Sequence, residues 1–152
     1  GYGGGPRHLI KAMTDLQSHS TSNPCSISQA ATVAALQGNQ AFLKDWRQSF
    51  RTRRDLVMEG VRTIPGLSCL VPQGAFYLYP SCEGILGKKT PQGHVLSNDE
   101  EVCQYLLESV GISVVHGAAF GLSPYFRISY ATDVNTLKEA CMLIGKAFSA
   151  LD

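Results

Sequence analysis

The sequence lacks the marks of several large classes of protein. No apolar run approaches the ~20 residues of a membrane-spanning helix, so no membrane partner is expected. Neither sign of charge is in excess: 13 Lys and Arg against 12 Asp and Glu leave a net charge of +1, which argues against a nucleic-acid partner, since such binders are strongly basic. The 44% of hydrophobic residues is too high for a disordered chain. A length of 152 residues suits one domain, or one domain with part of another.

Disulfide and metal patterns are also missing. The cysteines are odd in number and widely spaced, and neither they nor the histidines form a metal-ligand cluster, so no disulfide framework and no metal site is expected. The cysteines are predicted to be buried thiols of a cytoplasmic protein, because that compartment is reducing. The chain opens on Gly1–Pro6 without an initiator Met, which predicts a fragment. The cysteines are Cys25, Cys69, Cys82, Cys103 and Cys141, and the histidines are His8, His19, His94 and His116.

The order of apolar patterns predicts a mixed α/β fold, in which helices cover a small sheet in the second half of the chain. Asn23 and Pro24 are predicted to open the second helix, and Ser97 with Glu100 forms a capping box for a later one. Helices are expected over residues 6–18, 23–38, 40–63, 97–111 and from 133 onward, and strands over 69–71, 75–79, 113–115 and 125–131.

Two patterns are weak candidates for binding. The Gly1–Gly5 run could hold a phosphate at a helix N-terminus, but it lacks the P-loop pattern, so a tight turn is the favoured interpretation. Arginines and lysines over residues 44–62 alternate with acidic residues, with Arg51 and Asp55 spaced as an i,i+4 pair. A solvated helix face is therefore favoured over a nucleic-acid groove.

Arg127 is the strongest single candidate for a ligand-binding residue. It stands between Phe126 and Ile128 in a strand whose apolar residues alternate, where an unpaired charge would be costly to bury. Its guanidinium suits bidentate binding of a carboxylate. A salt bridge within the domain is the alternative.

Four motifs in order resemble class I aminotransferases of the aspartate aminotransferase type, and the resemblance covers essentially the whole chain. His116 stands where the family's third motif has proline. The motifs are Gln17–Pro24 with Ile27–Ala31 and Ala35–Gly38, then Pro72–Tyr77 (P-x-G-A-F-Y), Val114–Gly121 (V-x-P-G-x-x-F-G) and Phe126–Ala131 (R-I-S-F/Y-A).

The resemblance implies a fold-type-I enzyme that uses pyridoxal 5′-phosphate (PLP) to transfer an amino group between an amino acid, aspartate-like or similar, and a 2-oxo acid. It implies that residues 1–38 end a large cofactor domain, 39–64 form a long interdomain helix, and 65–152 form a small domain. By the same resemblance, Arg127 binds the substrate α-carboxylate and Phe76 lines the cleft over the cofactor. Ser22 and Asn23 reach the neighbouring active site in a homodimer.

No catalytic residue is assigned within this chain. In the family, the lysine that binds PLP and the phosphate-binding arginine precede a segment like Gly1–Pro6, so both are expected outside it. The chain alone is therefore expected neither to bind PLP covalently nor to transaminate. In one subgroup an arginine that reads the side-chain carboxylate occupies the position of Ser18, so that residue cannot supply such specificity here. The lysines outside the family's motif are Lys11, Lys44, Lys88, Lys89, Lys138 and Lys146.

Three alternatives stay open. A different fold-type-I PLP enzyme, such as a β-lyase or a synthase acting on a sulfonium substrate, would share the small domain. A non-catalytic folding or dimerisation module would explain the alanine-rich helices. A plain ligand-binding α/β domain with Arg127 as its anion site is disfavoured by the four ordered motifs.

Overall fold

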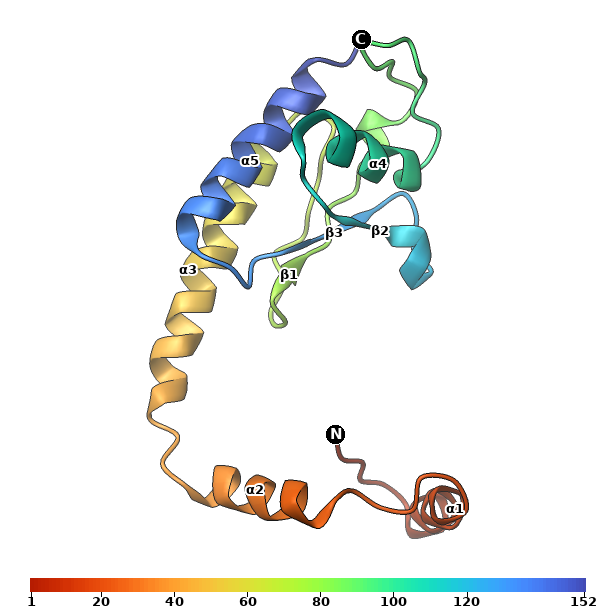
Figure 1. Cartoon of the computed structure of the whole chain (residues 1–152), viewed down its shortest axis with the longest axis vertical. Coiled ribbons are helices and arrows are strands. Elements are labelled where there is room, and N and C mark those ends of the chain that lie inside the picture. Colours follow the sequence, from red (N-terminus) through yellow and green to blue (C-terminus); the bar gives the residue numbers. More distant parts are fainter. The chain divides into compact units, whose positions relative to one another are not determined.

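A computed structural model describes residues 1–152, which divide into two units at Lys44 and Asp45. The first unit contains α1 (Arg7–Ser18) and α2 (Ser26–Gln37), and the 21-residue helix α3 (Phe42–Arg62) begins at its end. The second unit contains the rest of α3 and all later elements, labelled in Figure 1. No helix combines the length and the hydropathy needed to cross a membrane.

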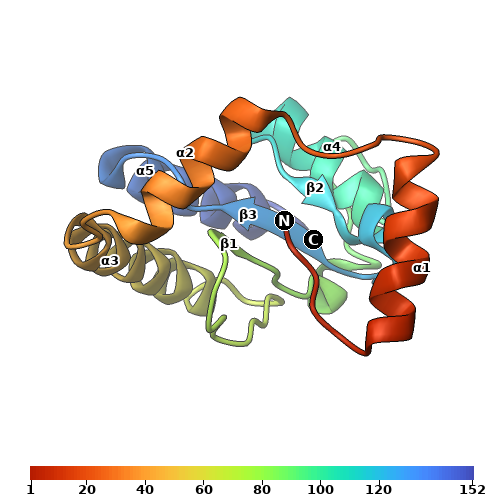
Figure 2. The same ribbon diagram turned by 90° about the horizontal axis from the view of Figure 1, so that it is seen from below.

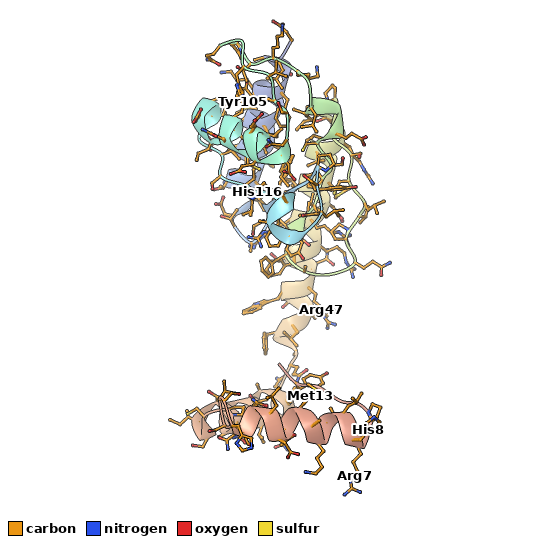
Figure 3. All side chains as sticks on the ribbon, turned by 90° about the vertical axis from the view of Figure 1, so that its right-hand side faces the viewer. Arg7, His8, Met13, Arg47, Tyr105 and His116 are labelled. Atoms are coloured by element: carbon orange, nitrogen blue, oxygen red, sulfur yellow. The ribbon has the colours of Figure 1, made fainter.

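The two helices of the first unit hold no buried residue. Arg7 and His8 stand in the first turn of α1 (Figure 3). The predicted start of α2 at Asn23 and Pro24 was wrong by two residues, since Cys25 is the N-cap. The Pro24 carbonyl accepts from the side-chain amide of Gln29 at 2.9 Å, and the first backbone bond of the helix runs from Gln29 N–H to the Cys25 carbonyl.

Two further helices begin at side-chain caps. Helix α4 (Asp99–Val110) starts after Asn98, whose side chain accepts from Glu101 N–H, while the Glu101 carboxylate accepts from Ser97 N–H at 2.7 Å. The capping box predicted at Ser97 and Glu100 therefore lies one residue later. The last helix, α5 (Val134–Ser149), begins near residue 133 as expected, and Asp133 caps it by accepting from two backbone N–H groups.

The second unit contains a three-stranded antiparallel sheet of order β1-β3-β2, formed by β1 (Tyr77–Leu78), β2 (Val115–His116) and β3 (Phe126–Ser129). Figure 2 shows β3 between the other two. The predicted strand over 69–71 was wrong. In this part of the chain only the preceding residue, Ser68, forms an isolated bridge, with Ser81. The other strands are shorter than predicted; Pro80, which has no N–H to donate, follows soon after β1.

Helices α3, α4 and α5 bury their apolar faces with the sheet in one core. The alternation predicted for the last strand is confirmed, since Phe126, Ile128 and Tyr130 are 0%, 7% and 2% exposed. Helices α3 and α5 lie side by side (Figures 1 and 2), and Gly60 of α3 faces Cys141 of α5. The mixed α/β class with a small helix-covered sheet is therefore confirmed. Other core residues are Val57, Val61, Val102, Leu106, Leu137, Ile144 and Phe148.

The surface of α3 differs in one detail from its prediction. Asp55 pairs with the adjacent Arg54 at 2.7 Å rather than with Arg51. Arg54 also donates to the Pro72 carbonyl at 3.2 Å. That bond ties α3 to the segment that leads into β1.

Candidate functional site

Arg127 lies at the centre of the sheet, half-buried on β3 and opposite Val115 of β2. Its guanidinium carbon stands 4.9 Å from the centre of the Phe120 ring and 5.8 Å from that of Tyr77. Such cation–π contacts orient a guanidinium without neutralising its charge. None of the chain's three ion pairs includes Arg127. The alternative of a structural salt bridge is therefore not what the structure shows.

The rings beside Arg127 belong to a larger group that we call the aromatic shelf: Tyr77, Tyr79, Phe120 and Tyr125. Tyr79 and Tyr125 are stacked, with their ring centres 5.4 Å apart and an interplanar angle of 7°. Tyr79 also meets Phe120 edge-on at 6.3 Å. Tyr77 of β1, Tyr79 just after it and two residues of the loop before β3 thus supply the shelf, of which Tyr77 and Phe120 lie against the cation.

Phe120 belongs to η2 (Gly117–Phe120), a 3-10 turn in the loop between β2 and β3. His116, in the place of the family's proline, ends β2 just before this turn (Figure 3). A Cβ on Gly117 would stand 2.1 Å from the Leu122 carbonyl oxygen, so only glycine fits there. The Tyr79 hydroxyl donates to the carbonyls of Gly117 and Leu122 at 3.1 and 3.3 Å. These contacts explain physically why a glycine stands at this point of the motif.

Asp99 is the residue that sequence reasoning missed. It is 1% exposed, and its Oδ2 accepts from Ala118 N–H at 3.1 Å, Ser123 O–H at 2.6 Å and Tyr125 N–H at 3.3 Å. Burial would raise the pKa of this carboxyl, but these three bonds together hold the pKa below its ordinary value. An acidic residue in the first turn of a helix is common, so nothing in the local sequence indicated this role.

Phe76, predicted to line the cleft, precedes β1 with its side chain 53% exposed. Its ring meets Tyr77 edge-on at 5.9 Å, and its carbonyl accepts from Tyr130 N–H at 2.8 Å. Ala75 takes a left-handed backbone conformation with φ of 63°, and its carbonyl accepts from the Tyr130 hydroxyl. The backbone is therefore anchored while the Phe76 ring stays exposed.

Ser22 and Asn23, predicted to reach a neighbouring active site, are exposed residues of the first unit, in the loop between α1 and α2. Ser22 adopts a left-handed backbone conformation with φ of 64°. Its N–H donates to the Gln17 carbonyl at 2.8 Å. The loop is thus fixed to the end of α1 by its backbone, which leaves both side chains outward.

A cavity of about 440 Å³ adjoins the aromatic shelf. Its lining residues are Ser68, Cys69, Leu70, Pro72, Tyr77, Tyr79, Leu122 and Tyr125. Cys69 is the one thiol in its wall, and burial raises the pKa of that thiol. The wall is therefore mainly aromatic and apolar, with the Ser68 hydroxyl as a polar group, and its thiol is not activated as a nucleophile.

The cysteines form no disulfide. Burial raises the pKa of Cys82 and of Cys103 to about 12, so both remain thiols. Cys25 is exposed, contrary to the expectation that the cysteines are buried. No group of three or more His, Cys, Asp or Glu residues could hold a metal ion.

A fold-type-I enzyme holds PLP by a lysine. The cavity beside the shelf has no lysine in its wall, so its lining does not fit the PLP aldehyde. What the second unit does offer is a cation oriented by two rings and held by no carboxylate. That arrangement can bind an anionic group of a small molecule.

Comparisons with known proteins identify the family to which the chain is similar. The sequence model of the family described as "Aminotransferase class I and II" matches residues 1–144. An aspartate aminotransferase from Rhizobium meliloti (strain 1021) is 57% identical over 99% of this chain. A probable aspartate/prephenate aminotransferase from Rhizobium leguminosarum bv. phaseoli is 51% identical over 96% of it.

Solved structures show the same likeness. The crystal structure of an aspartate aminotransferase from Rhizobium meliloti matches 98% of the chain at 56% identity with a TM-score of 0.89. The chain spans about 37% of the length of these relatives. With 144 of its residues matched by the family's own sequence model, the chain belongs to the class I and II aminotransferases.

Proposed function

We propose that this chain is the part of a PLP-dependent aminotransferase that grips the substrate's α-carboxylate, and that Arg127 is the group that does so. The observation that carries the proposal is the guanidinium lying over Phe120 and Tyr77 with no acidic side chain paired to it. A guanidinium fork matches a carboxylate in two parallel hydrogen bonds. Phe76, exposed beside Tyr77, is proposed to line the same cleft.

The proposed reaction moves an amino group between a dicarboxylic amino acid and a 2-oxo acid. The relatives' names include aspartate and prephenate, which both carry two carboxylates. In this proposal Arg127 fixes one carboxylate and so orients the reacting carbon, a contribution of positioning rather than of proton transfer. The lysine that binds PLP is proposed to lie outside residues 1–152.

Residues 1–38 are proposed to end the cofactor domain, 39–64 to link it, and 65–152 to form the small domain. Exposed apolar side chains on α1 and α2, among them Leu16 and Ile27 at 73% and 78%, favour a fragment whose first helices pack elsewhere in a homodimer. Ser22 and Asn23 are proposed to serve the second subunit's site. Five free thiols support a reducing, cytoplasmic location.

Replacing Arg127 by lysine in the full-length protein tests the function. A point charge cannot form the bidentate pair, so the loss of one charge-assisted bond should cost about 1.5–3 kcal/mol. With aspartate and 2-oxoglutarate as substrates, kcat/KM should fall at least about tenfold. Arg51→Lys, the same change at an exposed arginine of α3, is the matched control and should leave the rate unchanged. A change below about twofold in Arg127→Lys would contradict the assignment.

The second test concerns the 152-residue chain alone. After mixing with PLP and reduction by borohydride, mass spectrometry should find no stoichiometric label at any one lysine, because the lysine of the proposed PLP site lies outside the chain. Stoichiometric labelling at a single position, for example Lys88 or Lys89, would refute that part of the proposal. The same measurement on the full-length protein should give one labelled lysine and is the positive control.

A further inference from the structure

The loop between β2 and β3 is held at both ends by one carboxylate. Asp99 Oδ2 accepts from Ala118 N–H, just after β2, and from Tyr125 N–H, just before β3. Its shortest bond, 2.6 Å, comes from the Ser123 hydroxyl within the loop. Asp99 thus joins the first turn of α4 to both sides of a segment that otherwise extends from the sheet.

This loop carries Phe120, the ring whose centre lies 4.9 Å from the Arg127 guanidinium carbon. Its other bonds, apart from those within its own turns, come from the Tyr79 hydroxyl, which donates to the Gly117 and Leu122 carbonyls, and from Cys82 N–H, which donates to the Pro124 carbonyl at 3.0 Å. The Tyr79 hydroxyl therefore donates to carbonyls of the loop, while Asp99 is the side chain that accepts from backbone N–H groups of the loop. Loss of the carboxylate would leave Ala118 N–H and Tyr125 N–H without these acceptors and would loosen the loop that carries Phe120.

Joining three donors by a buried carboxylate costs free energy. Burial at 1% exposure penalises the charged form unless hydrogen bonds compensate it. None of the ion pairs includes Asp99. Its charge is stabilised first by the N–H and O–H groups of the loop and then by the electrostatic attraction of the nearby His116. A charge held this way fixes geometry more sharply than a neutral acceptor would.

We propose that Asp99 is a positioning residue for Arg127: by clamping both ends of the 118–125 loop, it holds the Phe120 ring against the guanidinium and so sets where that group meets a carboxylate. The inference rests on the proposed function and deepens it. Asp99 itself touches neither substrate nor cofactor in this scheme. Its effect passes through Phe120.

The test compares three variants of the full-length protein. Asp99→Asn weakens the clamp, and Ser123→Ala removes its shortest bond at an exposed residue, where folding is tolerant. Ser109→Ala is the matched control: it also removes a 2.6 Å hydroxyl bond, but at the far end of α4, to the Tyr105 carbonyl. The probe is maleate, a dicarboxylate with no amino group, and its Kd is measured by calorimetry alongside Tm, KM and kcat.

The Kd for maleate and the KM for aspartate should rise about tenfold in Asp99→Asn and severalfold in Ser123→Ala, because a displaced binding group loses affinity steeply. kcat at saturation should fall by less than about twofold, and Ser109→Ala should match the wild type. If Asp99→Asn does not fold, Ser123→Ala decides by the same criteria.

Two results would overturn the inference: a lower Tm with unchanged Kd, which is a purely structural role, or a fall in kcat as large as the rise in KM. If Arg127→Lys weakens maleate binding while Ser123→Ala and Asp99→Asn do not, the positioning role fails and the proposed function stands. If the wild-type protein neither binds maleate nor transfers an amino group, the proposed function fails and this inference fails with it.

Discussion

Gly60 and Gly145 give a sharp test of the packing between α3 and α5. Both are half-buried helical glycines at this contact. A Cβ at Gly60 would stand 2.7 Å from Cys141 Sγ and 2.8 Å from Cys141 Cβ, whereas one at Gly145 would stand 3.6 Å from the nearest atom of Ile64. The first is an overlap and the second an ordinary van der Waals contact.

Two opposing effects set the change in the free energy of unfolding when either glycine is replaced by alanine. Alanine is about 1 kcal/mol better than glycine in a helix interior, and it reduces the entropy of the unfolded chain by the same amount at both sites. Overpacking costs about 1–3 kcal/mol. Cys141 Cβ is attached to the backbone and cannot rotate away, so the helices must separate and the cost at Gly60 exceeds the gain.

The expected outcome is that Gly60→Ala is less stable than Gly145→Ala by about 2 kcal/mol. Gly145→Ala should equal or exceed the wild type. Urea unfolding of the full-length protein, followed by amide hydrogen exchange within α3 and α5, measures the difference. If Gly60→Ala proves as stable as Gly145→Ala, the two helices are not as close as the structure places them.

Three further outcomes follow from particular contacts. Tyr105→Phe removes the buried bond from the Tyr105 hydroxyl to the Ala147 carbonyl, 2.9 Å long, and should lower the free energy of unfolding by about 1 kcal/mol; no change in the urea midpoint would argue against that bond. Asp133→Ala removes the cap that accepts from Asn135 and Thr136 N–H, and should cost about 0.5–2 kcal/mol, seen as faster hydrogen exchange in the first turn of α5 and absent from its last turn. The folded pKa of Asp99 is depressed, so the stabilisation it gives is present above its unfolded pKa, about 3.9, and is lost as the pH falls through the folded pKa. In an acid titration below about pH 4, the wild type should therefore lose stability more steeply than Asp99→Asn. Parallel curves would refute this.

Much of the fold could be predicted because its signals are local. The 3.6-residue period of α3, the start of the last helix near Asp133 and the alternation around Arg127 each depend on neighbours along the chain. Two errors fell at helix starts, where residues one or two positions apart can each serve as the N-cap. Asn98 took the cap predicted for Ser97, and Cys25 the one predicted for Asn23.

The candidate site divides in the same way. Its cation was found from the sequence, since an arginine between two core positions of a strand needs an explanation in any fold. Its surroundings could not be found. Phe120 and Tyr77 reach Arg127 from two different elements, and the register of β2 on β3, Val115 opposite Arg127, decides that meeting.

The amino-acid sequence by itself determined the class of fold, the family and the strand on which the key cation lies, because periodicity and ordered motifs are properties of the chain alone. Only the tertiary structure decided that Arg127 has aromatic rings rather than an acid beside it, and that Asp99 joins two ends of a loop. Both depend on pairings between residues far apart in the chain. Strand register and helix packing create those pairings, and no local pattern encodes them.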